Sequence, residues 1–271
     1  MTGPIFDTHA HYSSRAFDAD RIALLDSLPD KGVVGVCEQA THSGDAPRVL
    51  ELAHRYPWVV AAIGIHPESL LPAADCGEEG PAPTVSVYGG DWAAEMQALT
   101  PYYDDPKVVA VGECGLDYYW PVPKDAQLAL FEAEIWLALE LDKPIIVHDR
   151  QAHADVYALL KKYRPKGIVH CYSGSAEDAV QLAAQGLYIG FGGACTFNGA
   201  KRAAKAIEAL PLDAIVLETD CPYMAPEPVR GTRCDSSLIR YVGAYIAQRK
   251  ALEPEEVFRT TAANARRVFG L

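Results

Sequence analysis

Histidine and carboxylate residues recur in this sequence in or directly after short apolar runs. In the first of these runs, Asp7, His9 and His11 alternate with Thr8 and Ala10. Because side chains alternate across a strand, the two imidazoles are expected on one face, where they form a natural pair of metal ligands. A histidine pair of this kind also arises by chance in a loop, so the motif alone leaves both interpretations open.

Four later apolar runs end in the same residue types. The residues concerned are Glu113, His148, His170 and Asp220. A buried histidine or glutamate without partners costs several kcal/mol, and a single one is readily explained as a satisfied core group. Five strand ends that each supply such a residue are better explained by a metal centre at one rim of the sheet.

The predicted ligand set is His9, His11, Glu113, His148, His170 and Asp220. One catalytic zinc typically takes three protein ligands, so six candidates favour two divalent ions. We assign His9, His11 and Asp220 to one ion. His148 and His170 are assigned to the other, with Glu113 between the two ions. Nitrogen and oxygen ligands without thiolate permit zinc, manganese or magnesium, with magnesium least suited to imidazole.

A scaffold must bring these distant residues together. Eight short apolar runs, rich in β-branched residues, are expected to be strands, and they span residues 5–11, 32–39, 59–66, 108–116, 145–150, 168–172, 187–191 and 215–220. Segments with helical periodicity separate them, and helical stretches at 238–249 and 253–269 close the chain. This alternation predicts an α/β fold, a single (β/α)8 TIM-like barrel over 1–271, with the metal site at the carboxyl ends of the strands.

One segment, residues 71–90, breaks this rhythm because it is rich in proline and glycine. We interpret it as a surface loop insertion, and a lid over the site is the alternative. The seven cysteines form no C-x-x-C pair and indicate reduced thiols. Cys114, Cys171 and Cys221 each follow a proposed ligand by one residue, so alternation predicts that they point away from the metals and are buried.

Composition limits the classes of function. The chain has 271 residues, of which 49% are hydrophobic and 22% charged, which excludes disorder over most of its length. It contains no apolar run of the ~20 residues that a membrane helix needs and no signal peptide, so a cytoplasmic protein is expected. The formal net charge of −12 disfavours nonspecific adhesion to nucleic acid, but bound metal ions can supply local positive charge to a nuclease.

The strand-end motifs resemble those of the TatD-type metal-dependent deoxyribonucleases, in the amidohydrolase-like superfamily. The resemblance runs in order from residue 5 to the C-terminus, and its most specific segments are Gly112-Glu113-Cys114-Gly115-Leu116-Asp117-Tyr118-Tyr119 and Leu217-Glu218-Thr219-Asp220-Cys221-Pro222-Tyr223. It implies a TIM-like barrel, a divalent-metal centre and hydrolysis of phosphodiester bonds in DNA. The family's ligand positions match the six residues already chosen.

Three departures from the family pattern bear on the choice of substrate rather than on the metal chemistry. Asp149 follows His148, where small or sulfur-bearing residues are more usual. Arg233 is followed by Cys234, Asp235 and Ser236, where the family commonly has an asparagine and a nearby proline. The segment 71–90 is also longer than usual.

Residues near the ligands are assigned catalytic and supporting roles. Asp220 orients or deprotonates the attacking water or serves only as a ligand, and Glu113 bridges the ions. Glu218 and Asp7 should face the same interior and fix histidine tautomers from behind.

Other residues near the strand ends are candidates for substrate binding. Arg150 and Arg230, and Arg233 beside it, would clamp phosphate, although solvated surface charge is an equal alternative for each. His66 would bond the phosphate or support the ligands. The tyrosines near the ligands would stack on a base, against the alternative of ordinary packing, and they are Tyr118, Tyr119, Tyr172 and Tyr223.

The sequence thus predicts a metal-dependent deoxyribonuclease with two divalent ions (zinc, manganese or magnesium). The absence of an extended basic surface favours action on DNA ends or short single strands, and the expected deoxyribonuclease is of the 3′-5′ exonuclease type. The alternative is a binuclear amide, lactone or small-ester hydrolase, since the same barrel serves that chemistry. A metal-binding scaffold without activity is a third possibility. DNA or a short oligonucleotide is the expected partner, with no membrane and no obligate protein partner.

Overall fold

The computed structural model describes residues 3–71 and 88–271, so most of the predicted 71–90 insertion lies outside the described residues. The strands are β1 (Ile5–Ala10), β2 (Val33–Gln39), β3 (Val59–Ile63), β4 (Val108–Asp117), β5 (Ile145–Arg150), β6 (Gly167–Val169), β7 (Leu187–Phe191) and β8 (Ile215–Leu217). The helices are α1 (Arg21–Ser27), α2 (Ala46–Arg55), α3 (Trp92–Leu99), α4 (Lys124–Glu140), α5 (His153–Tyr163), α6 (Ala176–Ala184), α7 (Lys201–Ala209), α8 (Ile239–Lys250) and α9 (Pro254–Phe269).

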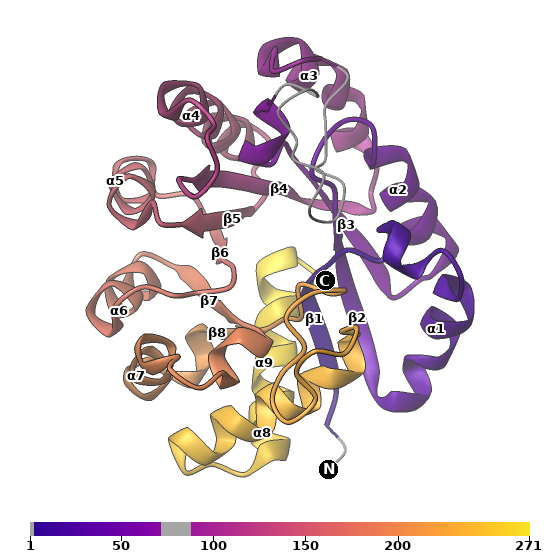
Figure 1. Cartoon of the computed structure of the whole chain (residues 1–271), viewed down its shortest axis with the longest axis vertical. Helices are drawn as coiled ribbons and strands as arrows, with labels where there is room; N and C mark the ends of the chain where they lie inside the picture. Colours follow the sequence, from indigo (N-terminus) through magenta and orange to yellow (C-terminus); the bar gives the residue numbers. More distant parts are fainter. Residues whose placement is uncertain (1–2, 72–87) are drawn as a thin grey trace. The chain divides into compact units, whose positions relative to one another are not determined.

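The strands follow one another in chain order, β1 to β8, in one eight-stranded sheet. Helices alternate with these strands along the chain, as Figure 1 shows. Strand–helix alternation with sequential strand order is the topology of a (β/α)8 TIM-like barrel, and it confirms the predicted fold class. Among the described residues, none of the helices combines the length and apolarity needed to cross a bilayer.

Three expected strands end three residues earlier than predicted, and one of them is β3, which ends at Ile63 and does not include His66. β6 ends at Val169 and β8 at Leu217, so His170 and Asp220 follow their strands instead of lying within them. The reason lies in the backbone just beyond each strand, where Cys171 has φ 47° and Asp220 has φ 63°. A left-handed residue cannot continue a strand, and outside glycine this conformation is found most often in aspartate, asparagine and histidine.

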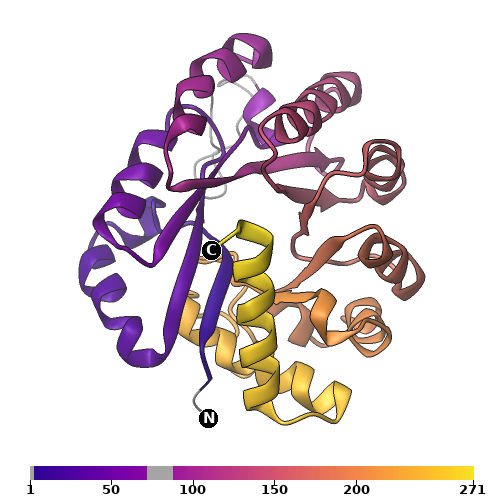
Figure 2. The ribbon, with the colours of Figure 1, turned by 180° about the vertical axis from the view of Figure 1, so that it is seen from behind.

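The chain divides into two compact units, of which unit 1 comprises Met1–Glu38 and Ile168–Leu271. In unit 1, helix α9 packs along β1 and β8, and Figure 2 shows it lying beside β1. Helix α9 begins with Pro254 and two glutamates and ends with two arginines before Gly270, which has φ 70°. These features match the helix dipole and a left-handed cap, and the predicted helix at 253–269 is confirmed.

Side chains of α9 hold it to the strands of unit 1. The rings of Phe269 and Phe6 lie 5.8 Å apart. Asn264 donates from its amide nitrogen to the carbonyls of Leu212 and Ile215, at 3.0 and 2.8 Å, at the beginning of β8. The C-terminal helix therefore covers the strands that carry the first and last candidate ligands.

Unit 2, Gln39–Gly167, is built around β4, which pairs in parallel with β3 and β5. Helix α4 packs on β4 and buries Leu130, Phe131 and Ile135. Gln127 of this helix accepts from the Asp117 amide at 2.8 Å and donates to the Asp117 carbonyl at 2.9 Å. The end of β4 is thus held in place by a buried side chain of the following helix.

Candidate metal centre

Unit 1 holds a group of three potential metal ligands, His9, His11 and Asp220. Their ligand atoms all lie within 4.8 Å of one another. The Nε2 atoms of His9 and His11 are 3.2 Å apart, and Asp220 Oδ1 lies 3.7 Å from the first and 3.2 Å from the second. The sequence assigned these three residues to one ion, and the structure brings them together.

Main-chain pairing between β1 and the segment after β8 fixes this group. The Asp220 amide donates to the His9 carbonyl at 2.9 Å, and the His11 amide donates to the Cys221 carbonyl at 3.0 Å. The left-handed backbone of Asp220 turns the chain at this point. Residues about 210 positions apart are therefore aligned by backbone hydrogen bonds and not by side chains alone.

The charge on Asp220 is favoured by its neighbours. Burial by itself would raise the pKa of this carboxyl group, but the hydrogen bond and charge of His11, with the charges of His9 and His170, outweigh burial and lower the pKa. Asp220 is therefore held as a carboxylate, the form that binds metal.

Asp7 supports this group differently from the prediction. We expected its carboxylate to orient the His9 ring. It instead accepts from the His9 amide at 3.2 Å, from the Thr219 amide and hydroxyl at 3.0 and 2.7 Å, and from the Ser236 hydroxyl at 2.7 Å. Burial raises the pKa of Asp7 to about 7 despite these bonds. Asp7 fixes the backbone on either side of the ligands and not an imidazole tautomer.

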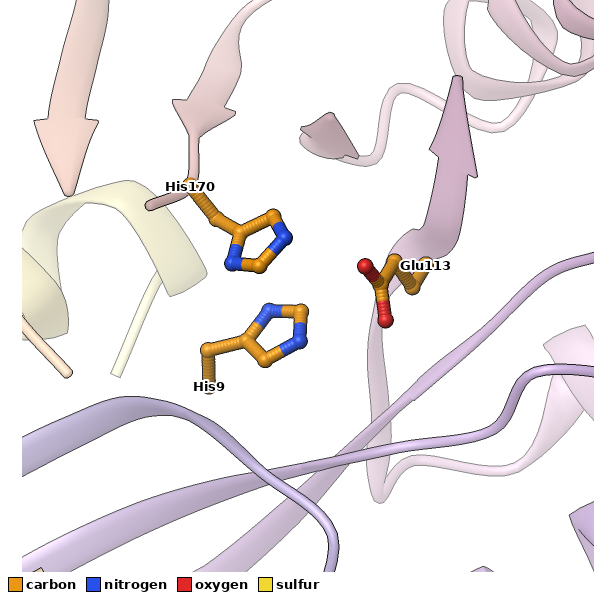
Figure 3. A group of neighbouring side chains, drawn as sticks. All are labelled: His9, Glu113 and His170. Atoms are coloured by element: carbon orange, nitrogen blue, oxygen red, sulfur yellow. The ribbon is translucent and has the colours of Figure 1, made fainter. Parts of the chain in front are cut away.

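His170 and Glu218 form a second pair in unit 1. The rings of His170 and His9 stack at a centroid distance of 3.8 Å with 8° between their planes, as Figure 3 shows. Glu218 Oε1 lies 3.7 Å from His170 Nδ1 and accepts from the Cys171 amide at 2.5 Å. This placement agrees with the expected supporting role of Glu218 behind a histidine.

A glycine in β7 makes room for this buried carboxylate. A Cβ atom at Gly190 would lie 2.3 Å from Glu218 Oε2, which is closer than real Cβ contacts. Any larger residue at position 190 would push the Glu218 side chain away from its present position, and with it the contact to His170.

Unit 2 holds the other group of three, His66, Glu113 and His148, with ligand atoms again within 4.8 Å of one another. His148 Nδ1 lies 3.0 Å from Glu113 Oε1, and His66 Nε2 lies 3.7 Å from the same oxygen. The two imidazole rings meet edge to face at 4.4 Å. Glu113 is carried by β4, and Figure 3 labels its side chain.

The structure therefore places His66 beside two predicted ligands, which agrees with the expected alternative of ligand support, and phosphate binding stays a prediction. His66 is buried, and its Nδ1 accepts from the Glu68 amide at 3.2 Å, which leaves Nε2 directed toward Glu113. The expected pairing of His148 with His170 joins the two units and stays a prediction.

Asp117, at the end of β4, is a functional candidate that the sequence analysis quoted in a motif but gave no role. Its Oδ2 lies 3.0 Å from His148 Nε2, and its Oδ1 accepts from the Tyr119 amide at 2.9 Å. Burial would raise the pKa of Asp117, but the hydrogen bond and charge of His148 lower it. The signal was present in the strand, since Glu113 and Asp117 are separated by four residues and alternation places them on one face.

The predicted substrate residues of unit 2 differ in how they are held. The Tyr118 hydroxyl donates to Asp155 at 2.7 Å, and Lys124 Nζ lies 4.0 Å from the centre of the Tyr118 ring. Arg150 is half exposed, with NH1 3.9 Å from Asp117 Oδ2 and its guanidinium 3.8 Å from the centre of the Tyr119 ring. Arg150 is thus close to the support of a predicted ligand, whereas Tyr118 is held by an aspartate and a lysine.

In unit 1 the predicted substrate residues are only partly retained. Tyr223 is exposed, and the Arg230 guanidinium lies 4.1 Å from the centre of the Phe197 ring, so both stay predictions. Arg233 binds both oxygens of Asp20, at 2.8 and 2.5 Å, and its role as a phosphate clamp stays a prediction. Tyr172 is ruled out as a stacking residue because it is buried and its hydroxyl donates to the Ser175 carbonyl at 2.6 Å.

The cysteine prediction is confirmed for two residues and wrong for the third. Cys114 and Cys221 are fully buried. Cys171 is only partly buried, with its sulfur 3.9 Å from the Met224 sulfur. The left-handed backbone of Cys171 breaks the strand alternation on which the prediction depended.

The donor chemistry of the two groups fits divalent ions. Each group offers imidazole nitrogen and carboxylate oxygen and no thiolate. Such mixed sets suit zinc and manganese, and suit magnesium less because of the imidazoles.

Comparisons with known proteins agree with this chemistry. The chain is 36% identical over 269 residues to an uncharacterised metal-dependent hydrolase, YabD, of Bacillus subtilis, with 98% of each chain covered. It is 30% identical over 279 residues to a protein of Erwinia billingiae named 3′-5′ ssDNA/RNA exonuclease TatD, covering 98% of this chain and 99% of the relative.

A solved structure and a family model complete the comparison. The crystal structure of YJJV, a TatD homologue from Escherichia coli, matches with a TM-score of 0.86 and 28% identity, covering 98% of each chain. The family model described as TatD related DNase matches residues 6–270. These matches span nearly the whole sequence and include every predicted ligand, so the chain belongs to the TatD-related family of metal-dependent hydrolases.

Proposed function

We propose that this protein is a metal-dependent phosphodiesterase that removes nucleotides from the 3′ end of single-stranded DNA or of short oligonucleotides. The observation that carries the proposal is the presence of two groups of three nitrogen and oxygen ligands, His9 with His11 and Asp220, and His66 with Glu113 and His148. The exonuclease name of the Erwinia relative supports the choice of substrate.

Divalent ions held by these groups would lower the pKa of water from ~15.7 toward ~7 and stabilise charge on phosphate oxygens. The chain's own residues would position the reactants. Asp220 stays ionised because its histidine neighbours lower its pKa, and this suits a ligand better than a base that works near neutral pH. Arg150, with its half-exposed guanidinium, would bind a phosphate oxygen next to the Glu113 group.

The sharing of Glu113 between two ions remains part of the proposal. It is supported by the strand order, because the carboxyl ends of successive parallel strands meet at one rim in a (β/α)8 barrel. Titration with Mn²⁺ followed by electron paramagnetic resonance tests it. Two ions bridged by a carboxylate are magnetically coupled, whereas two isolated Mn²⁺ signals would contradict a shared ligand.

Cleavage of labelled oligonucleotides tests the function itself. A 3′-labelled and an internally labelled single strand are incubated with Mg²⁺, Mn²⁺ or Zn²⁺, and we expect release of the 3′ label first. His148→Ala should abolish turnover and lower the metal content. His54→Ala is the matched control, because His54 is exposed and pairs with Asp105 at 2.7 Å, and it should leave both unchanged. Internal cuts that appear first would contradict end-directed action.

The alternative of an amide, lactone or small-ester hydrolase is tested with the same preparation. Dipeptides and lactones are compared with p-nitrophenyl phosphodiesters, and we expect turnover of the phosphodiesters alone. Turnover of the acyl substrates without phosphodiester cleavage would overturn the proposal. The predicted cytoplasmic location belongs to this proposal as well, and cell fractionation tests it.

A further inference from the structure

Two adjacent aromatic residues, Tyr119 and Trp120, lie exposed just beyond the end of β4. Tyr119 is 53% exposed and Trp120 is 37% exposed. Their rings meet edge to face, with centroids 5.1 Å apart and 87° between the planes. Exposing two large rings side by side forgoes the free energy of burying them and leaves aromatic surface available to a ligand.

A continuous series of contacts within unit 2 joins this pair to the candidate ligands. Glu113 contacts His148 at 3.0 Å, and His148 contacts Asp117 at 3.0 Å. Asp117 in turn accepts from the Tyr119 amide at 2.9 Å. The backbone that carries the aromatic pair is thereby fixed relative to the residues that would hold the metal.

Arg150 supplies positive charge at the same place. Its guanidinium lies 3.8 Å from the centre of the Tyr119 ring and 3.9 Å from Asp117 Oδ2, and Arg150 pairs with Asp117 in the β4–β5 ladder. A half-exposed guanidinium over the Tyr119 ring, which itself meets the Trp120 ring, offers the two contacts that a nucleotide needs. One is a charged partner for phosphate, and the other is an aromatic surface for the base.

We propose that Tyr119 and Trp120 form a stacking subsite for an unpaired nucleobase of the substrate, with Arg150 holding the adjacent phosphate. This inference rests on the proposed nuclease function and names the part of the substrate that the site recognises. Only a base outside a duplex presents a free π face, so the subsite selects single strands and frayed ends. Because any base can stack, the subsite does not select a sequence.

A second aromatic pair provides a matched control. Trp136 of α4, which is 57% exposed, meets Tyr163 edge to face at 5.2 Å, and Lys162 Nζ lies 4.5 Å from the centre of the Tyr163 ring. This pair repeats the geometry and the neighbouring cation of the proposed subsite. Its charged neighbours are Lys162 and Glu132, and none of its described contacts reaches a candidate ligand.

The experiment is a double-mutant cycle in which the Trp120 ring is removed from the protein and one base is removed from the substrate. Exonuclease kinetics are measured on a short 3′-labelled single strand and on strands in which one nucleotide near the 3′ end is replaced by an abasic spacer. We expect the spacer, at one position, to raise KM about tenfold for the wild-type protein, the scale of one base–aromatic stack. Trp120→Leu should raise KM for the intact strand by a similar factor. The KM of this variant should be the same for strands with and without the spacer.

Variants that preserve or mimic the subsite complete the design. Trp120→Phe should restore most of the lost affinity, and Trp136→Leu should behave as the wild type on both substrates. Equal spacer penalties in the wild type and in Trp120→Leu, with cleavage intact, would overturn the subsite while leaving the nuclease function standing.

Binding distinguishes the subsite from the function. Affinity for a fluorescent phosphorothioate strand, with and without the spacer, is measured by anisotropy without turnover. Spacer-sensitive binding that depends on Trp120, in a protein that cleaves no phosphodiester, would contradict the proposed function and retain the subsite. Binding that depends on neither the base nor Trp120 would overturn the subsite whatever the outcome of the cleavage assays.

Discussion

Unit 1 positions its ligand group through the backbone, whereas unit 2 positions its group through side chains. In unit 1, Asp7 and the main-chain bonds between β1 and the segment after β8 fix His9, His11 and Asp220. In unit 2, the Asp117 carboxylate binds the ring of His148 directly. Asp7 and Asp117 are both buried. Asp117, however, lies 3.9 Å from the guanidinium of the half-exposed Arg150.

The comparison suggests a division of labour between the two groups. In unit 1 the supporting backbone bonds and Asp7 are buried, although His11 and Asp220 themselves are 14% and 18% exposed. A ligand group whose support also touches an exposed arginine and an exposed tyrosine is placed to respond to the substrate. We therefore expect changes in unit 1 to act on metal binding and folding, and changes in unit 2 to act also on KM.

The largest effect is expected from Asp220→Ala. Loss of this carboxylate removes an anionic ligand of the unit 1 group and several kcal/mol of charge stabilisation, so turnover should fall on the order of 10³-fold. Metal analysis should show loss of one ion, with the unit 2 group still loaded. Wild-type turnover in this variant would show that the unit 1 group is not part of the reaction.

A smaller effect is expected from Asp117→Asn, which replaces the carboxylate beside His148 Nε2. Removal of such a partner typically costs 10–100-fold in metal affinity or activity. Asp155→Asn is the control, because the Asp155 carboxylate accepts a hydrogen bond from the exposed Tyr118 hydroxyl and not from a candidate ligand. If Asp117→Asn lowers stability but leaves metal affinity and KM unchanged, the Asp117 carboxylate does not affect metal binding by His148. The proposed difference between the two ligand groups would then lose its support.

Gly190→Ala tests the buried support of unit 1. The new methyl group would meet Glu218 Oε2 at 2.3 Å, and overpacking of this kind typically costs about 1–3 kcal/mol. Thermal unfolding should show the loss, and metal affinity should fall because Glu218 moves from His170. Gly192→Ala is a graded control, because its Cβ would lie 3.3 Å from the nearest atom, the Glu218 carbonyl oxygen. Equal losses of stability in Gly190→Ala and Gly192→Ala would argue against a steric contact between residue 190 and Glu218.

The clearest pH dependence, without any effect on the ligand groups, is expected from Glu134→Gln in unit 2. Burial raises the pKa of Glu134 well above its usual value, and its Oε1 accepts from the Ile65 amide at 2.8 Å. The unfolded chain releases this proton at lower pH than the folded protein, so the stability that Glu134 contributes declines as pH rises above ~4.5.

Glutamine keeps the acceptor for Ile65 and has no proton to lose. Relative to the wild type, Glu134→Gln should therefore gain stability as pH rises, by about 1.4 kcal/mol per pH unit until the folded-state pKa is reached. Denaturant unfolding between pH 5 and 8 measures the difference. Asp7→Asn sharpens the comparison, because Asp7 accepts four hydrogen bonds and its amide variant should be destabilised. A pH-independent difference for Glu134→Gln would contradict the assigned cause.

The fold and most ligand positions follow from the sequence because both depend on local patterns. Apolar runs separated by helical periodicity are visible in any window, and a strand that ends in His or Glu is evident without knowledge of its neighbours. The grouping of His9, His11 and Asp220 was predicted for this reason, since the barrel order makes the first and eighth strands neighbours.

The supporting contacts were harder to predict because they depend on local backbone geometry. A period-2 hydrophobic pattern does not predict that Cys171 and Asp220 adopt left-handed backbone conformations. These conformations end β6 and β8 early and leave Cys171 partly exposed. The bonds of Asp7 to the backbone, and of Arg233 to Asp20, depend on which atoms lie within 3 Å. The place of His66 beside Glu113 could not be predicted, because the direction of its ring depends on the hydrogen bond that Nδ1 accepts from the Glu68 amide.

The long sequence span of the Asp7 contacts has a consequence for biosynthesis. Asp7 bonds to Thr219 and Ser236, which lie 212 and 229 residues later in the chain. A ribosome must therefore translate nearly the whole message before the pocket of His9 and His11 exists. The residues of the other pocket, 66 to 148, emerge much earlier. The group of His9, His11 and Asp220 can therefore be completed only when synthesis of the chain is almost finished.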